Sequence, residues 1–196
     1  MHWKKIIVFA VIVWVVVLIG GMALLWSVAE DLPSLEQLEN YEPRLVTTVI
    51  SADSVIIKEF YTQRRVLVPL DNIPDHLVDA VLSTEDRRFY DHWGMDIIRV
   101  SKAVLVDIST LSMKEGASTI TQQLARNLYF THKRTVTRKL KELITAIQIE
   151  RNYSKDEILE MYLTQTYFGG GAYGVQSAAQ HYFSKPVEEL SLAESA

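Results

Sequence analysis

The 21-residue run Ile6–Trp26 contains no charged side chain, and it limits most strongly what this chain can fold into. As a helix the run is about 31 Å long, which matches the hydrocarbon core of a bilayer. Lys4 and Lys5 precede it, and Glu30 and Asp31 follow it. The positive-inside rule therefore predicts a cytoplasmic N-terminus and places the rest of the chain beyond the membrane. A cleaved signal peptide is the alternative, but its apolar core is shorter, and no A-x-A-like site precedes Glu30.

Composition limits what the rest of the chain can form and bind. The 196 residues suffice for one domain with a hydrophobic core. The chain has no cysteine, which excludes disulfides, thiol nucleophiles and cysteine-based metal sites. A net charge of -4 argues against nucleic acid as a partner. We expect a cytoplasmic tail at 1–5, a transmembrane anchor at 6–26, a linker with a small β-element at 27–68, and a helical domain at 69–196.

Residues 44–68 have strand character in three segments, LVTTVIS, VIIKEFY and RRVLV. Asp53–Ser54 between the first two fits a tight turn, although glycine suits such a turn better than Ser54. We therefore expect a small β-element beside the membrane.

Downstream, the hydrophobic period is helical. We predict helices at Asp75–Tyr90, Thr119–Leu128, Thr137–Arg151, Lys155–Leu163 and Gln176–Phe183, with a glycine-rich break at Tyr167–Tyr173. The apolar stretch Gly94–Met113 is expected to be a core helix or to lie on the membrane surface. The final residues, LSLAESA, resemble the start of a further helix, so the chain is expected to be a fragment.

Glu85 occupies an unusual position in the first of these helices. Its helical face is otherwise apolar, being made of Val78, Val81, Leu82 and Phe89. A carboxylate on such a face is costly unless it is paired or its pKa rises. A raised pKa suits a general acid or base near neutral pH. The alternative is an ordinary acid that reaches solvent or pairs with Arg88.

The segment Gly116–Asn127, GASTITQQLARN, is the most distinctive. Thr119 and Gln122 match a capping box, which explains two side chains only. The helix that follows has a polar face without acids, formed by Gln122, Gln123, Arg126 and Asn127. Amides and a guanidinium suit hydroxyls and phosphate oxygens, and a helix N-terminus also favours anions.

A second cationic group lies in the sequence HKRTVTRKLK, which begins at residue 132. Arg138 lies four residues after Arg134 and four before Glu142, so an ordinary ion pair on a helix is one interpretation. For Arg126, Arg134 and Arg138 together we favour an anionic ligand such as a pyrophosphate group. Anionic membrane headgroups are a third interpretation.

Other chemistries have weaker support. His92 has no second histidine at metal-ligand spacing, so we expect a structural hydrogen bond there and not a zinc site. Asp86 is expected to orient Glu85 or to cap a neighbouring helix. The sequence contains no G-x-S-x-G or S-x-x-K motif, so Ser118 is interpreted as a cap or a ligand contact.

Five segments, in order, resemble the motifs of the peptidoglycan glycosyltransferases of family 51. This family comprises monofunctional transglycosylases and the N-terminal domain of class A penicillin-binding proteins. The segments are EDRRFYDHWG at 85–94, GASTITQQLARN at 116–127, RKLKE at 138–142, KDEILEMYLTQTYFG at 155–169 and AAQHYFSK at 178–185. The upstream stretches LPSLEQLENYEP and QRRVLVPL resemble the class A enzymes more than the monofunctional ones.

The chain departs from the family pattern at two positions: Thr164 stands where motif four usually has Asn, and Ser54 stands where a turn glycine is common. The family's domain continues beyond motif five. The resemblance therefore implies a C-terminally incomplete domain, and the class A enzymes add a transpeptidase domain.

The resemblance implies a mainly α-helical, lysozyme-like fold with a cleft facing the membrane. The implied reaction polymerises lipid II into glycan strands by inverting transfer, with undecaprenyl pyrophosphate as the leaving group. Glu85 would be the general base on the acceptor's 4-hydroxyl. Arg126, Arg134 and Arg138 would hold the pyrophosphate. Glu142, as a second catalytic residue, would position these cations or a divalent ion, Mg²⁺ or Mn²⁺.

The resemblance also assigns supporting roles. Sugars and phosphates would be oriented by Ser118, Gln122, Gln123 and Asn127, and Met95–Met113 would dip into the outer leaflet. The implied partners are lipid II, the nascent glycan strand, the bilayer and other proteins of cell-wall synthesis. The implied location is the inner membrane, with the catalytic domain in the periplasm.

Two other functions stay open on the sequence. One is a muralytic hydrolase on the same general fold, which has no use for a pyrophosphate-binding cluster or a lipid-facing segment. The other is an inactive membrane-anchored fragment that serves only in interaction. Incubation with labelled lipid II separates these from a polymerising enzyme.

Overall fold

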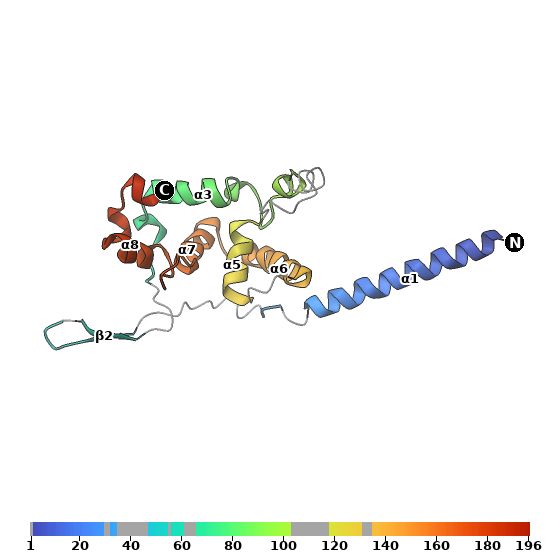
Figure 1. Cartoon of the computed structure of the whole chain (residues 1–196), viewed down its shortest axis with the longest axis horizontal. Helices are drawn as coiled ribbons and strands as arrows, with labels where there is room; N and C mark the ends of the chain where they lie inside the picture. The colour runs from blue at the N-terminus through green and yellow to red at the C-terminus, as the bar shows by residue number, and fades with distance from the viewer. Residues whose placement is uncertain are drawn as a thin grey trace.

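The computed structural model describes residues 2–29, 32–34, 47–54, 56–60, 66–102, 118–130 and 135–196. These residues form a long N-terminal helix, a two-stranded hairpin and a cluster of shorter helices (Figure 1). The expected mainly helical class with a small β-element is confirmed.

The N-terminal helix α1 runs from His2 to Ala29. Its segment Lys5–Ala23 has the length and the composition of a membrane-crossing helix, with a mean hydropathy of 3.0 and no residue buried by the rest of the protein. The helix projects away from the helical domain and approaches it at α6, Val136–Asn152 (Figure 1). An apolar segment that no other described residue buries is what a lipid-embedded anchor requires.

The hairpin consists of β1, Thr47–Ile50, and β2, Ile56–Phe60, which pair antiparallel. In its turn the Ser54 N–H donates to the Ser51 carbonyl at 3.0 Å, and Ser54 has φ +64°. This left-handed conformation is the reason that glycine suits the position better. The third expected strand, RRVLV, is wrong over its described residues, because 66–68 form no strand and Val68 is buried in the helical core.

The helical domain contains α3 (Asp75–Glu85), α5 (Ile120–Tyr129), α6, α7 (Lys155–Gln165), α8 (Val175–Phe183) and α9 (Leu192–Ser195), with 3-10 turns η1 (Leu70–Asn72), η2 (Phe89–Asp91) and η3 (Val187–Glu189). The predicted ends of α5, α6, α7 and α8 are confirmed to within two residues. Residues 97–102 are helical inside the apolar stretch predicted for 94–113, and the rest of that stretch lies outside the described residues.

The helix predicted for Asp75–Tyr90 is too long, because α3 ends at Glu85. Asp86 leaves the helical conformation with φ −156° and ψ 76°. Phe89 still reaches the core, at 1% exposure, but it does so from η2. Glu85 therefore stands at the end of a helix rather than in its middle.

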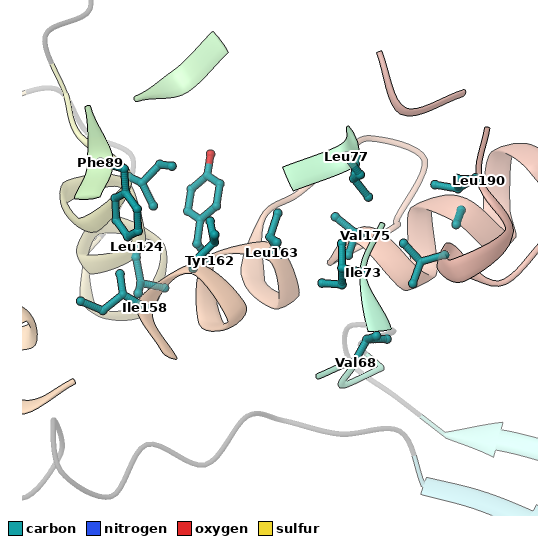
Figure 2. Close-up of a cluster of buried hydrophobic side chains, with 14 of the residues drawn as sticks. Val68, Ile73, Leu77, Phe89, Leu124, Ile158, Tyr162, Leu163, Val175 and Leu190 are labelled. Carbon is teal, nitrogen blue, oxygen red and sulfur yellow. The ribbon is translucent and has the colours of Figure 1, made fainter. Parts of the chain in front are cut away.

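The core is organised around α7. Its residues Ile158, Leu159 and Leu163 are completely buried, and α5 packs directly against it. Figure 2 shows Phe89, Leu124 and Ile158 at one end of the apolar cluster and Leu77, Val175 and Leu190 at the other, with Tyr162 and Leu163 between them. Burying a side chain of this size stabilises the fold by about 1.5–3 kcal/mol. This packing fixes α5 and α7, which carry part of the candidate site.

Candidate functional site

Glu85 is half-buried at the C-terminal end of α3 and faces α5. The Gln123 side chain donates from Nε2 to Glu85 Oε2 at 2.7 Å. Within the described residues, no group donates to the other carboxylate oxygen, Oε1. The alternative pairing with Arg88 is not observed, because Arg88 lies 3.4 Å from Asp96 and 3.6 Å from Asp91.

Tyr162 of α7 orients this contact. Its hydroxyl donates to Gln123 Oε1 over a long 3.4 Å. Burial, followed by the nearby Glu85 carboxylate, raises the pKa of Tyr162 to about 12. The phenol therefore stays protonated at neutral pH and acts as a donor. Because tyrosine donates to the amide oxygen, the amide nitrogen of Gln123 is left to face Glu85.

Asp86 connects the end of α3 to the start of α5. Its buried carboxylate accepts from the backbone N–H of Ile120 at 3.0 Å and lies 3.0 Å from His92 Nε2. The expectation that Asp86 caps a neighbouring helix is confirmed. His92 is buried against this carboxylate, which agrees with the structural role expected for it.

The predicted capping box at Thr119 and Gln122 is half formed. Thr119 Oγ1 accepts from the backbone N–H of Gln122 at 3.2 Å. The Gln122 side chain does not return to Thr119, because its Nε2 donates to the Gly94 carbonyl at 3.1 Å. Gln122 is thus drawn into the site, and its Oε1 is available to a cation.

That cation is Lys139, which lies in the RKLKE motif at 138–142 but was not among the predicted site residues. Its Nζ donates to Ser118 Oγ at 2.6 Å, to Gln122 Oε1 at 2.9 Å and to Glu142 Oε2 at 3.2 Å. The spacing of Lys139 and Glu142, three apart on a helix, was a signal that could have found it. The expected role of Ser118 as a contact of the site agrees with this geometry.

Glu142 lies at the centre of the cationic cluster, which we define as Arg126, Arg138 and Lys139. It is 1% exposed and accepts from the guanidinium of Arg138 through its other oxygen. Both carboxylate oxygens therefore have cationic donors. The described residues contain no group of three or more side chains suited to a metal ion. The surroundings of Glu142 do not fit a protein-held divalent ion. They fit a carboxylate that holds Arg138 and Lys139 in place.

The positive charges of the cationic cluster repel one another. Burial lowers the pKa of Lys139, and repulsion from Arg126 and Arg138 lowers it further, against the attraction of Glu142. The Nε atoms of Arg126 and Arg138 are buried and, among the described residues, have no hydrogen-bond partner. Cations that repel one another and keep unused donors are suited to a multiply charged anion.

One predicted site residue is not brought into these contacts, and another is not described by the structure. Asn127 is half-buried on α5, and no hydrogen bond to another described residue places it in the cluster. Arg134 lies outside the described residues, so its predicted role stays a prediction.

The site thus has two parts joined by neighbouring residues of α5. Gln123 holds the Glu85 carboxylate, and Gln122 holds Lys139 of the cationic cluster. One part can accept a proton, and the other can hold a phosphate-bearing group.

Comparison with known proteins gives a family match. The family model described as Transglycosylase matches residues 53–196. Penicillin-binding protein 1A of Neisseria flavescens is 48% identical over 165 residues, which cover 84% of this chain and 21% of that protein. Penicillin-binding protein 1A of Rickettsia prowazekii (strain Madrid E) is 42% identical over 200 residues, covering 99% of this chain and 25% of that protein. The chain therefore spans about a fifth to a quarter of the length of these relatives.

Proposed function

The chain belongs to the transglycosylase family, and from this membership we propose that it is a peptidoglycan glycosyltransferase that polymerises lipid II into glycan strands. The observation that carries the proposal is that two consecutive residues of α5 connect the Glu85 carboxylate to the cationic cluster. Gln123 donates to Glu85, and Gln122 accepts from Lys139. A glycosyl transfer from a diphosphate donor requires a base for the acceptor and a stabilised leaving group, and this arrangement supplies both.

In the proposed reaction Glu85 removes the proton of the acceptor's 4-hydroxyl. The hydroxyl oxygen attacks C1 of the donor sugar, and the bond from C1 to the diphosphate oxygen breaks. Attack from the face opposite the leaving group inverts the configuration at C1. The contact from Gln123 holds Oε2 in place, so Oε1 is the oxygen available to the proton.

The leaving group is undecaprenyl diphosphate, and its developing charge is neutralised by Arg126, Arg138 and Lys139. Arg134, by the family resemblance, would join them. Glu142 is buried and accepts from Arg138 and Lys139 through its two oxygens, so it acts as a positioning residue. No step in this proposal passes through a metal ion.

The cationic cluster also argues against the alternative function of a muralytic hydrolase. A muralytic enzyme cleaves a glycosidic bond and releases a sugar hydroxyl, which needs protonation rather than several cations. The buried Nε atoms of Arg126 and Arg138, which have no partner among the described residues, are better explained by a diphosphate.

The deciding experiment compares Glu85→Gln with Asp79→Asn on labelled lipid II. Asp79 is an exposed acid on the same helix, so it is a matched control. We expect Glu85→Gln to lower polymerisation by about 10²–10⁴-fold, the usual contribution of a general base. Asp79→Asn should polymerise normally. Polymer formation that survives Glu85→Gln would remove Glu85 as the base, and cleavage of finished peptidoglycan would favour the hydrolase.

We propose that α1 anchors the chain in the inner membrane, with the N-terminus in the cytoplasm and the helical domain in the periplasm. Its apolar length supports the anchor, and the lysines before it support the orientation. A membrane-anchored domain meets lipid II at the bilayer surface. Association with other proteins of cell-wall synthesis stays a prediction.

A further inference from the structure

Tyr162 connects the apolar core of the domain to the candidate site. Its ring is buried on α7, at 4% exposure, among core residues that include Leu124 and Leu163. Figure 2 shows the ring in this cluster with its hydroxyl oxygen directed away from Leu163. Close packing holds such a ring in one rotamer, so the hydroxyl has a fixed place. A buried phenol also needs a hydrogen-bond partner, and the side chain of Gln123 provides one.

The direction of an amide side chain in this site is set by the protein group behind it. Gln122 accepts at Oε1 from the Lys139 ammonium, at 2.9 Å, and donates from Nε2 to the backbone carbonyl of Gly94, at 3.1 Å. A carbonyl can only accept a hydrogen bond. The Gly94 carbonyl therefore holds the amide nitrogen of Gln122 and leaves the amide oxygen for the cation.

Gln123, the next residue of α5, has the opposite direction. It donates from Nε2 to Glu85 Oε2 at 2.7 Å, and its Oε1 accepts from the Tyr162 hydroxyl at 3.4 Å. A reversed amide would place its oxygen against the Glu85 carboxylate, so that two acceptors would face each other. It would also withdraw the donor from Oε2. The Tyr162 hydroxyl stabilises the direction that avoids both effects.

We propose that Tyr162 is a positioning residue for the base. By holding the amide oxygen of Gln123, it keeps the amide nitrogen on Glu85 Oε2 and leaves Oε1 as the oxygen that takes the acceptor's proton. The Tyr162 hydroxyl lies behind the amide, so it acts through Gln123. Its effect on the rate rests on the proposed function, whereas its effect on the direction of the amide rests on the hydrogen bonds alone.

The kinetic test is Tyr162→Phe in the full chain, with labelled lipid II as substrate. The variant keeps the ring in the core and removes the hydroxyl. We expect kcat to fall about tenfold, the usual effect of losing a hydrogen bond that supports a charged group, while KM changes by less than about twofold. Tyr90→Phe is the matched control, because the Tyr90 hydroxyl is exposed and donates to Asp156 at 3.0 Å. Its kcat should equal that of the natural chain.

A double-mutant cycle tests whether Tyr162 acts through Gln123. Gln123→Met removes the amide and keeps a side chain of similar length. Tyr162→Phe added to this variant should lower kcat by less than about twofold further, because the amide that it directs is already gone. A further loss of about tenfold in that background would give Tyr162 a separate role and overturn the proposal.

The direction of the amide is measured without turnover. In the full chain in detergent, labelled with nitrogen-15 glutamine, the side-chain N–H resonance of Gln123 is identified by its loss in Gln123→Met. Glu85→Gln removes the charge that this N–H faces and should move the resonance upfield. We expect Tyr162→Phe to move it in the same direction and Tyr90→Phe to leave it in place. An unmoved resonance in Tyr162→Phe would overturn the proposal, as would a loss that raises KM and leaves kcat unchanged.

These readouts separate the role of Tyr162 from the proposed function. A natural chain that forms no polymer would count against the proposed function, and the resonance would still support or overturn the control of the amide by Tyr162. Polymer formation that depends on Glu85, together with an unmoved resonance in Tyr162→Phe, would support the enzyme and overturn the positioning role.

Discussion

Lys139 is the residue that connects the cationic cluster to the start of α5. Each of its three N–H donors contacts a different partner: Ser118, Gln122 and Glu142. Two of these partners, Ser118 and Gln122, precede Lys139 in the chain by 21 and 17 residues. Lys139 therefore fixes the start of α5 against α6 and places a positive charge between them. Its depressed pKa makes that charge sensitive to pH.

The activity should fall on the alkaline side earlier than an ordinary lysine would allow. Because the pKa of Lys139 is lowered from 10.5, its proton is lost at a lower pH, and the neutral amine no longer stabilises the leaving group. The pH profile of lipid II polymerisation should therefore have an alkaline limb below 10.5. Lys139→Arg should move that limb upward, since a guanidinium stays charged there. Lys141→Arg, two residues along α6, should leave it in place, and an unmoved limb in Lys139→Arg would assign it to another group.

At the scale of single residues, the sequence predicted which residues belong to the site better than it predicted which of them are in contact. Glu85 and Gln123 were singled out from helical spacing and composition, and the structure places them in contact. Lys139 was missed because its partners Ser118 and Gln122 come from another segment, and no local pattern reports such a pairing. The second half of the capping box failed for the same reason, since the Gly94 carbonyl competes for the Gln122 side chain.

Among the helices, α3 and α5 are joined by one buried carboxylate. Asp86 ends α3 and accepts from the first backbone N–H of α5. Asp86 therefore holds Glu85 and the polar face of α5 together, in addition to the direct contact of Gln123 with Glu85. This contact also explains why a helical pattern that continues to Tyr90 in sequence stops at Glu85.

Asp86→Ala should destabilise the domain by about 2–4 kcal/mol. The change leaves the Ile120 N–H and the His92 ring buried without their acceptor, and each unsatisfied buried donor costs about 1–3 kcal/mol. Asp91→Ala is the matched control, because Asp91 is exposed and makes a long surface ion pair. It should change stability by less than about 0.5 kcal/mol. Urea unfolding followed by circular dichroism measures both, and equal effects would contradict the anchoring role of Asp86.

Gly174, which precedes α8, has both a positive φ and a close backbone contact, whereas the nearby Gly171 has the positive φ alone. Gly174 and Gly171 have φ of +80° and +79°, so alanine at either position is strained by about 1–2 kcal/mol. At Gly174 the added Cβ would also lie 2.6 Å from the Thr164 carbonyl oxygen, whereas at Gly171 it would meet nothing within 4 Å. We expect Gly174→Ala to lower the free energy of unfolding by about 2–5 kcal/mol in total and Gly171→Ala by the strain alone. Similar losses in thermal unfolding would argue against the close approach.

The elements that sequence could predict are those whose stability is local. Helices α5 to α8 show the helical period, α5, α6 and α7 also have side-chain N-caps, and the ends of all four are correct to within two residues. The RRVLV segment has strand propensity, but Val68 is used in the core of the helical domain instead. Tertiary packing overrides propensity in that case, as is common for short apolar segments.

Over the whole molecule, the apolar helix α1 and the helical domain occupy separate volumes (Figure 1). The hairpin extends from the domain on the side away from α1 (Figure 1). This arrangement exposes the whole apolar surface of Lys5–Ala23, which a membrane would cover.

The proposed orientation can be read by labelling single cysteines, since the natural chain has none. A membrane-impermeant maleimide added to cells with a permeabilised outer membrane should label Asp91→Cys, whose position is exposed on the helical domain. It should label His2→Cys only after the inner membrane is opened. Labelling of both before that step would mean that α1 does not cross the membrane, and the reverse pattern would invert the topology.

The contact between α1 and α6 has a kinetic consequence. The helix that holds Arg138, Lys139 and Glu142 contacts α1. With α1 as the proposed anchor, the proposed leaving-group site therefore lies near the bilayer and diffuses along it. Encounters with a lipid-linked substrate then take place in two dimensions. Turnover should follow the mole fraction of substrate in the membrane rather than its bulk concentration, so adding inert phospholipid at constant total substrate should slow the reaction by surface dilution.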